Sequence, residues 1–185
     1  MRYVRFLFLF VVSCFAFAAC SSESAEPDIA FVQAVNTGNI DAVKYFLKHN
    51  SDPNTKDKNG TPLIVLAAKQ DNVPMIKRLL KAGAKIDLPN EEGQTALMLA
   101  ANQNHFNVVK YLLSERANIN AVSNSGSTAL MYASFQGNDL VVKLLIKKGA
   151  DVNKTNYYGD TALMSATSYG HQPVIDLLRK AGATR

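Results

Sequence analysis

Apolar and polar residues follow a helical pattern in two short stretches between Glu91 and Ala121. The first stretch predicts a helix from Thr95 to Gln103, and the second predicts a helix from Asn107 to Glu115. A tight break at Asn104 and His105 separates the two helices, and a loop follows the second. This part of the chain is therefore predicted to form a helix-turn-helix unit.

The same pattern recurs along the chain at intervals of 33 residues. One glycine marks each copy, and it is followed by alanine and leucine residues that keep the same interval. The aligned residues are Gly60, Gly93, Gly126 and Gly159; Ala67, Ala100, Ala133 and Ala166; Leu79, Leu112, Leu145 and Leu178; and Ala84, Ala117, Ala150 and Ala183. So many residues in one register indicate a tandem repeat, and a period of about 33 residues is typical of stacked helix pairs.

These residues resemble the ankyrin repeat, whose pattern combines a turn glycine, a threonine cap, paired alanines and leucines, then Gly-Ala and an asparagine. The copy that carries it most fully has Gly93, Thr95, Ala100, Ala101, Leu112, Leu113, Ala117 and Asn120, and the next has Gly126, Thr128, Ala133, Leu145, Gly149, Ala150 and Asn153. The resemblance covers roughly residues 28–185. It implies an all-α ankyrin-repeat solenoid of stacked helix-turn-helix units with β-turn-like tips.

The register divides this region into a degenerate N-terminal cap and four repeats. The cap is expected at 28–56, with helices near 28–36 and 40–48, and the repeats at 57–89, 90–122, 123–155 and 156–185. In the last repeat Arg179 replaces the leucine or isoleucine that we expect to be buried at Leu80, Leu113 and Ile146. An end repeat has only one neighbour, so both irregular copies are predicted to be caps.

Two positions depart from the repeat. Thr61 and Pro62 allow two interpretations. In the one that we favour, Thr61 caps the helix and Pro62 is its first residue; in the other, the turn is one residue short. Pro74 and Pro173 are expected in the first turn of outer helices, where the missing N–H has no partner to lose. Arg116 stands where the other copies have Gly83, Gly149 and Gly182, so we predict a strained left-handed residue or a shifted cap there.

The first twenty residues have the composition of an export signal. Arg2 and Arg5 precede an uncharged apolar run from Phe6 to Ala19, which is short for a membrane-spanning helix. We therefore expect a signal peptide at 1–19, a lipid-bearing Cys20 that resembles a bacterial lipoprotein site, and a polar linker over 20–27. The alternatives are a retained anchor or buried helix, an ordinary signal-peptidase site at residues 16–18, and a weaker lipid site ending at Cys14.

Composition excludes several kinds of chemistry from the repeat region. The chain has 185 residues, is 48% hydrophobic and carries a formal charge of +5, which fits a folded domain rather than a disordered one. Cys14 and Cys20 both belong to the signal region, and no basic stripe with interleaved aromatics suggests nucleic-acid binding. His105 and His171 share a register two repeats apart, about 20 Å, and cannot share a metal with each other. We expect no cofactor, no metal and no enzymatic activity.

The resemblance implies a concave face that binds a protein partner through the turn tips and the exposed side of the inner helices. By register the predicted contact residues are Glu91, Glu92, Gln94, Asn102 and Gln103; Asn124, Ser125, Ser127, Phe135 and Gln136; and Tyr157, Tyr158, Asp160, Ser168 and Tyr169. Four of them are aromatic and are expected to face water as binding anchors. The alternative for Phe135 and Tyr169 is packing against the neighbouring repeat.

The sequence thus predicts a monomeric protein-protein interaction module of the bacterial periplasm, held at a membrane only by its lipid. Proteins of this type are, by resemblance, often accessory or immunity proteins of an envelope enzyme. An exported effector that binds a host protein and an enzyme of unknown class are the alternatives.

Overall fold

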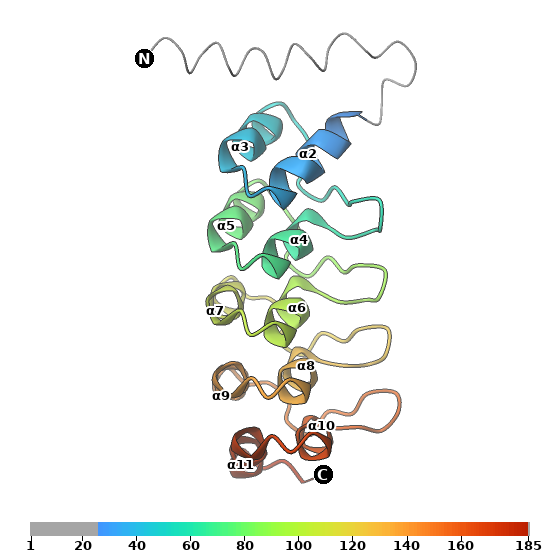
Figure 1. The fold of residues 1–185 in the computed structure, drawn as a ribbon, viewed down its shortest axis with the longest axis vertical. Helices are drawn as coiled ribbons and strands as arrows, with labels where there is room; N and C mark the ends of the chain where they lie inside the picture. The colour runs from blue at the N-terminus through green and yellow to red at the C-terminus, as the bar shows by residue number, and fades with distance from the viewer. Residues whose placement is uncertain (1–25, 185) are drawn as a thin grey trace.

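The computed structural model describes the backbone of residues 26–184 and the side chains of residues 28–184. Within this part of the chain, ten helices follow one another in pairs, and the pairs stack into a single column (Figure 1). The predicted signal peptide and Cys20 lie outside the described residues. The expected all-α solenoid of helix-turn-helix units is confirmed. Among the described helices, none combines the length and apolarity needed to cross a bilayer.

Each pair has an inner helix, beside the long loops, and an outer helix on the opposite side of the column (Figure 1). The inner helices are α2 (Glu26–Asn36), α4 (Leu63–Lys69), α6 (Ala96–Asn102), α8 (Ala129–Phe135) and α10 (Ala162–Ser168). The outer helices are α3 (Ile40–Lys48), α5 (Val73–Lys81), α7 (Phe106–Ser114), α9 (Asp139–Lys147) and α11 (Gln172–Lys180). Helix α2 begins two residues before the predicted domain boundary at residue 28.

Threonines begin three of the inner helices. The side-chain oxygens of Thr95, Thr128 and Thr161 accept a hydrogen bond from the backbone N–H three residues later, at 3.4, 3.3 and 3.2 Å. Each bond satisfies one of the amides that the first turn leaves unpaired. Helices of seven residues are too short to persist alone in water, so their stability must come from packing between repeats.

The favoured interpretation of Thr61 and Pro62 is wrong. Pro62 is the N-cap residue, with φ −64° and ψ 150°, and helix α4 begins at Leu63. Thr61 is held outside the helix because its backbone N–H donates to Asp57 Oδ1 at 2.8 Å. The alternative of a shortened turn also fails, since Pro62 keeps the register of Thr95. Pro74 and Pro173 lie in the first turns of α5 and α11, as predicted.

The core is a continuous column of small and branched residues. The aligned alanines and leucines are fully buried: Ala67, Ala100, Ala133 and Ala166, and Leu79, Leu112, Leu145 and Leu178, are all 0% exposed. Burial of one such leucine contributes about 1.5–3 kcal/mol. Every residue of α6 from Ala96 to Ala101 is buried, whereas α7 buries only Val108, Val109 and Leu112. The inner helices between the two ends of the column are enclosed, and the outer helices present one side to water.

The two ends of the column are closed differently. At the N-terminal end Phe31 and Val35 of α2 are 0% exposed. At the other end Arg179 is exposed, as predicted for a cap, although the corresponding Leu80, Leu113 and Ile146 are half-buried rather than buried. Met164 is 40% exposed, whereas its counterparts Val65, Met98 and Met131 are covered by the next repeat. The last repeat is therefore only a partial cap.

Arg116 adopts the left-handed conformation that the glycine register predicted. Its φ is +66°, compared with +95°, +89° and +90° at Gly83, Gly149 and Gly182. A side chain with a Cβ is strained there, because Cβ crowds the backbone at positive φ. The helix cap is not shifted, since Glu115 is the C-cap of α7, one residue before Arg116.

Candidate recognition face

The long loops end in four tight turns, which we call fingers one to four: residues 57–61, 90–94, 123–127 and 156–160. In each finger the N–H of the first residue donates to the carbonyl of the fifth, at 2.9–3.0 Å. The N–H of the fourth residue, a glycine, donates to the carbonyl of the first, at 2.9–3.1 Å. The second and third residues are left at the tip, which explains the β-turn-like tips that were predicted.

One side chain holds each finger from within. The first residue of each, Asp57, Asn90, Ser123 or Asn156, accepts hydrogen bonds from the backbone N–H groups of the third and fifth residues. These bonds are 2.8–3.0 Å long in fingers one, two and four, and 3.3–3.4 Å in finger three, where serine is shorter. The tips are therefore fixed before any partner binds, which lowers the ordering cost of binding.

Neighbouring fingers are joined by backbone hydrogen bonds. The N–H of Asn124 donates to the carbonyl of Glu92 at 3.0 Å, and its side-chain amide donates to the carbonyl of Glu91 at 2.8 Å. The N–H of Tyr157 donates to the carbonyl of Ser125 at 3.0 Å. Fingers two, three and four thus form a continuous strip along the column.

The strip requires glycine at positions 93 and 126. Both have positive φ, +72° and +79°. A Cβ on Gly93 would lie 2.6 Å from the backbone nitrogen of Asn124, and a Cβ on Gly126 would lie 2.8 Å from that of Tyr157. Any side chain at these two glycines would push the adjacent fingers apart.

We call the surface formed by the finger tips and the C-terminal ends of the inner helices the recognition face. Of the predicted contact residues, those that are exposed are Glu91, Glu92, Gln103, Asn124, Phe135, Gln136, Tyr157, Tyr158, Ser168 and Tyr169. The others, Gln94, Asn102, Ser125, Ser127 and Asp160, are half-buried.

Two of the half-buried residues, Gln94 and Asp160, are hydrogen-bonded to other side chains of the protein. Gln94 Nε2 donates to the hydroxyl of Tyr132 at 3.1 Å, and Asp160 Oδ2 accepts from Asn156 Nδ2 at 3.2 Å. The sequence did not indicate Tyr132, which stands where other copies have Leu66 and Leu99. Its hydroxyl also donates to Ser123 Oγ at 3.4 Å, so this phenol links two fingers to α8.

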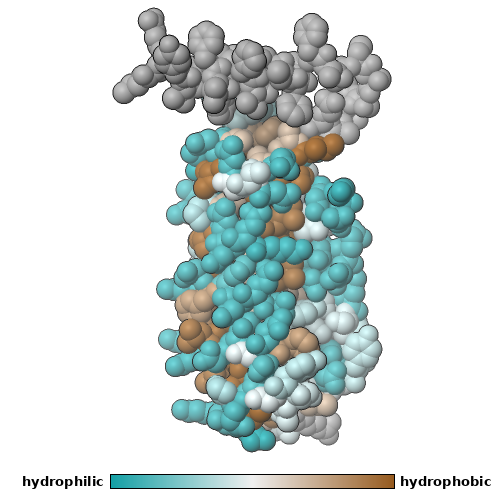
Figure 2. Space-filling model, in the orientation of Figure 1, coloured by the Kyte–Doolittle hydropathy of each residue, from teal (hydrophilic) through white to brown (hydrophobic). Residues whose placement is uncertain are grey.

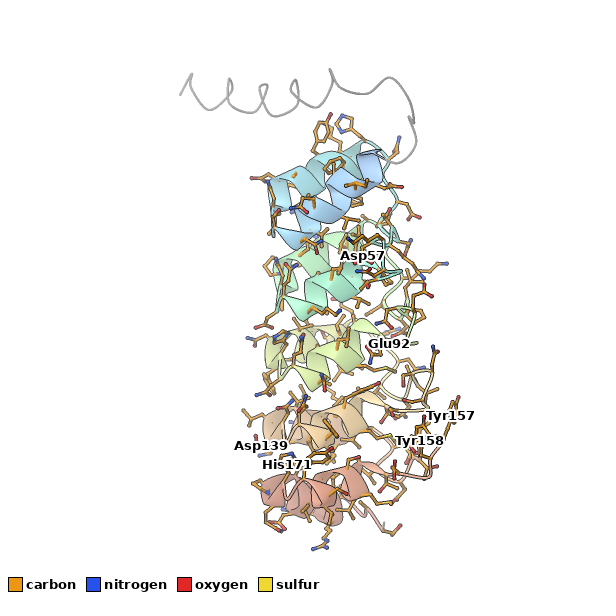
Figure 3. The ribbon with its side chains drawn as sticks, turned by 45° about the vertical axis from the view of Figure 1, so that its right-hand side comes forward. Asp57, Glu92, Asp139, Tyr157, Tyr158 and His171 are labelled. Atoms are coloured by element: carbon orange, nitrogen blue, oxygen red, sulfur yellow. The ribbon has the colours of Figure 1, made fainter. Side chains whose placement is uncertain are left out.

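The four exposed aromatics form two pairs rather than one cluster. Tyr157 and Tyr158 are 74% and 79% exposed at the tip of finger four, where they project from the column (Figure 3). Phe135 and Tyr169 both lie at the C-terminal ends of α8 and α10, away from the fingers, with ring centroids 4.4 Å apart in an edge-to-face contact. The expected alternative, packing between repeats, therefore holds for Phe135 and Tyr169, although they remain 42% and 58% exposed.

Two of the histidines are structural links between repeats. His105 Nδ1 lies 2.9 Å from the carbonyl of Ala68, and His171 Nε2 lies 2.9 Å from the carbonyl of Phe135. Asn138, at the same register, donates from Nδ2 to the carbonyl of Ala101 at 2.9 Å. Each side chain reaches back to the end of the preceding inner helix. Within residues 28–184, no group of histidine, aspartate and glutamate has the arrangement of a metal site.

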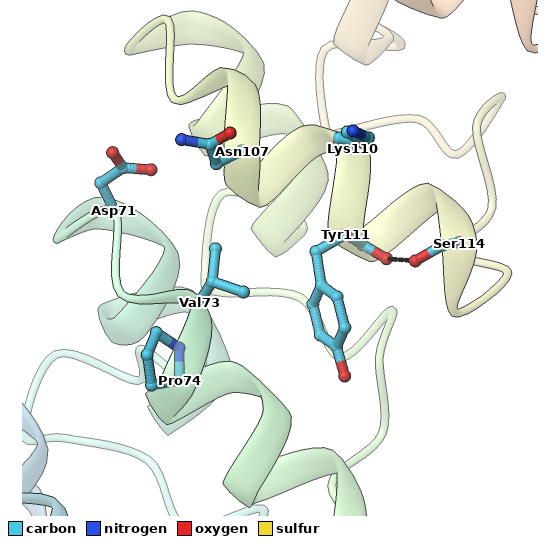
Figure 4. A pocket seen from close by; sticks show the side chains of 7 residues that line it. All are labelled: Asp71, Val73, Pro74, Asn107, Lys110, Tyr111 and Ser114. Atoms are coloured by element: carbon cyan, nitrogen blue, oxygen red, sulfur yellow. Dashed lines mark hydrogen bonds between the residues drawn. The ribbon is translucent and has the colours of Figure 1, made fainter.

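A groove between α5 and α7 lies on the outer-helix side, away from the fingers (Figure 4). It is lined by Asp71, Val73, Pro74, Asn107, Lys110, Tyr111 and Ser114. Ser114 Oγ donates to the Tyr111 carbonyl at 2.6 Å, and burial, helped by the Glu115 carboxylate, raises the pKa of Tyr111. The raised pKa keeps this phenol protonated at neutral pH.

The comparison with protein families agrees with this architecture. A family model described as ankyrin repeats in three copies matches residues 31–123 and 113–184. The chain belongs to the ankyrin repeat family. Ankyrin repeat proteins are typically non-enzymatic, and this membership indicates a protein-protein interaction module. No curated protein matches the sequence.

Proposed function

We propose that this ankyrin repeat protein holds one protein partner on its recognition face, as a monomeric and non-enzymatic module of the bacterial envelope. The observation that carries the proposal is the tip of finger four. Tyr157 and Tyr158 are the most exposed aromatics of the described residues, and they stand on a turn that Asn156 holds rigid. Aromatic rings fixed before binding are effective anchors, because they bury a large area at low entropic cost.

The remaining exposed positions supply polar contacts around this anchor. Glu91 and Glu92 on finger two carry negative charge, and Gln103 and Gln136 carry amides at the helix ends. An apolar anchor with a polar and charged surround is the usual composition of a protein interface. Fingers two and four together favour a partner with an apolar patch beside a basic one.

The location is proposed from the N-terminal sequence. Cleavage before Cys20 and acylation of that residue would hold the protein at an envelope membrane, next to a partner such as an envelope enzyme that it assists or inhibits. Mass spectrometry of the mature N-terminus should find a diacylated or triacylated Cys20. An unmodified N-terminus at Ala19 would instead indicate a soluble periplasmic or secreted protein.

The recognition face can be tested by capture of a partner from envelope extract. We expect the wild-type chain to retain a defined protein, and the triple variant Phe135→Ala, Tyr158→Ala, Tyr169→Ala to lose it. The matched control removes three exposed apolar side chains from other surfaces: Ile29→Ala, Tyr45→Ala and Leu140→Ala. Circular dichroism verifies that both triples are folded.

The comparison of the two triples decides the outcome. Loss of the partner only in the recognition-face triple supports the proposal. Equal retention by both triples would remove the assignment of this face, and turnover of a substrate by purified protein would remove the non-enzymatic role.

A further inference from the structure

The outer helices carry lysines in two rows, each filled on four of the five helices; the remaining positions are Asp176 in α11 and Ser114 in α7. One row holds Lys44, Lys77, Lys110 and Lys143, and the other holds Lys48, Lys81, Lys147 and Lys180. Within the described residues, the outer helices α3 to α11 contain ten lysine and arginine residues against three aspartates. The inner helices contain one lysine against two acidic residues. Positive charge is thus concentrated on one side of the column.

These lysines are free to meet a partner. All eight are exposed, and Figure 2 shows hydrophilic side chains projecting at successive levels of the edge where the outer helices lie. In the described part of the chain, the only one of the eight with an ion pair is Lys44, whose Nζ lies 2.8 Å from Asp41 Oδ1. The aspartates of α9 and α11 therefore leave most of the charge uncompensated.

The helix dipole accounts for only one of the two rows of lysines. Lys48, Lys81, Lys147 and Lys180 lie in the last turns of their helices, where a cation interacts favourably with the helix dipole. Lys77 and Lys143 lie in the middle of α5 and α9, where the dipole contributes nothing. The dipole of its own helix therefore explains neither Lys77 nor Lys143, and neither of them has an ion pair among the described residues, unlike Lys44 of the same row.

The spacing of the rows defines the shape of the complementary surface. Residues four apart on one helix are about 6 Å apart, and successive layers of packed helices are about 8–10 Å apart. The lysines thus form a broad grid that extends over the length of the column. A grid of this kind matches a plane of negative charges better than it matches a single phosphate backbone. Bases would find few aromatic residues to stack on, because α5, α9 and α11 have none and the tyrosines of this face are Tyr45 in α3 and the half-buried Tyr111 in α7.

The N-terminal sequence places such a plane close by. If Cys20 carries the predicted lipid, only residues 21–25 separate it from the start of α2 at Glu26. The six extended steps from Cys20 to Glu26 span at most about 22 Å. The N-terminal cap would then begin within that distance of a bilayer surface.

We propose that the outer-helix face docks on anionic phospholipid headgroups, so that the column lies along the membrane surface. Each lysine near an anionic surface strengthens binding by about fivefold, and the attraction fades beyond a Debye length of about 10 Å at 0.1 M salt. The fingers are on the opposite side of the column and would face away from the membrane (Figure 1). The recognition face would therefore stay accessible to a partner while the outer face is occupied.

Vesicle sedimentation tests this docking with the full chain carrying Cys20→Ser, which removes the acylation site. The vesicles contain about 30% phosphatidylglycerol in phosphatidylcholine, which gives them an anionic surface, and pure phosphatidylcholine gives the baseline. The test variant is Lys77→Gln with Lys143→Gln. The matched control is Lys58→Gln with Lys69→Gln, which removes the same charge from exposed lysines outside the outer helices.

We expect the partition coefficient on anionic vesicles to fall at least about tenfold in the test variant and less than about twofold in the control. Binding of the parent chain should exceed the baseline and should be lost at about 0.5 M salt. Equal losses in the two variants, or no excess over phosphatidylcholine, would overturn the proposal. Tighter binding to duplex DNA than to the vesicles at the same salt would overturn it in favour of nucleic acid.

Discussion

Fingers two and four have the same backbone frame and opposite surface chemistry. The N–H of Gln94 donates to Asn90 Oδ1 at 2.8 Å, and the N–H of Asp160 donates to Asn156 Oδ1 at the same distance. On these two frames the tips are Glu91 and Glu92 in one case and Tyr157 and Tyr158 in the other. The first and fourth residues of a finger therefore determine its shape, and the second and third determine what it can bind.

The two fingers also differ in what lies beside them. Finger two is covered by finger three, which contacts Gly93 through Asn124. Gly159 of finger four has no described atom within 4 Å of the position that a Cβ would take. Finger four is the exposed end of the strip, so its tyrosines are open to a partner from more directions.

The largest effect should come from the apolar column that supports both fingers. Leu112→Ala removes a side chain that is 0% exposed between repeats, and we expect it to lower the free energy of unfolding by about 2–5 kcal/mol. Urea denaturation followed by circular dichroism measures the change. The partly buried Leu144 provides the control, since its replacement by alanine should cost less. Equal costs would show that the column is not the main support.

A matched pair of glycine substitutions tests the difference in surroundings. Gly159→Ala introduces only the strain of a residue at φ +84° and should cost about 1 kcal/mol. Gly93→Ala adds a collision with the backbone of Asn124 and should cost about 2–4 kcal/mol. Thermal unfolding of both variants provides the comparison. If the two costs were the same, the fingers would not be as closely joined as the hydrogen bonds indicate.

The connections that lead into fingers three and four have different residues at the left-handed position, Arg116 in the first and Gly149 in the second. Arg116→Gly removes the Cβ at φ +66° and should stabilise the protein by up to about 1 kcal/mol, which raises Tm by about 2–4 °C. Arg116→Ala keeps the Cβ and should give no such gain. A lower Tm in the glycine variant would mean that contacts of the arginine side chain stabilise the protein by more than the strained backbone destabilises it.

Exchange of the tip residues should have the smallest effect on stability. Glu92→Tyr and Tyr158→Glu both change exposed side chains, so each should alter the free energy of unfolding by less than about 0.5 kcal/mol. Partner capture should distinguish them, because only Tyr158→Glu removes the proposed anchor. Loss of capture in Glu92→Tyr alone would move the anchor to finger two.

Much of the fold could be predicted from the repeat register. A period of 33 residues located the helices, the buried alanines and leucines, and the left-handed backbone at Arg116, because each depends on local spacing or on one residue type. The register also placed Pro62 opposite Thr95. The favoured interpretation failed there because it relied on local capping preference, whereas Asp57 holds Thr61 in the finger.

The recognition face was predicted as a set of positions, and the tertiary structure decided how exposed each residue is and what it contacts. Gln94 is half-buried because Tyr132 of the following repeat reaches its side chain, and the four aromatics divide into two pairs because the length of an inner helix separates them. These facts depend on contacts between residues more than thirty positions apart. A repeat sequence determines which residues occupy equivalent places, because the backbone unit is the same each time. Only the stacked column determines which of those places are covered, because coverage depends on the side chains of the neighbouring repeat.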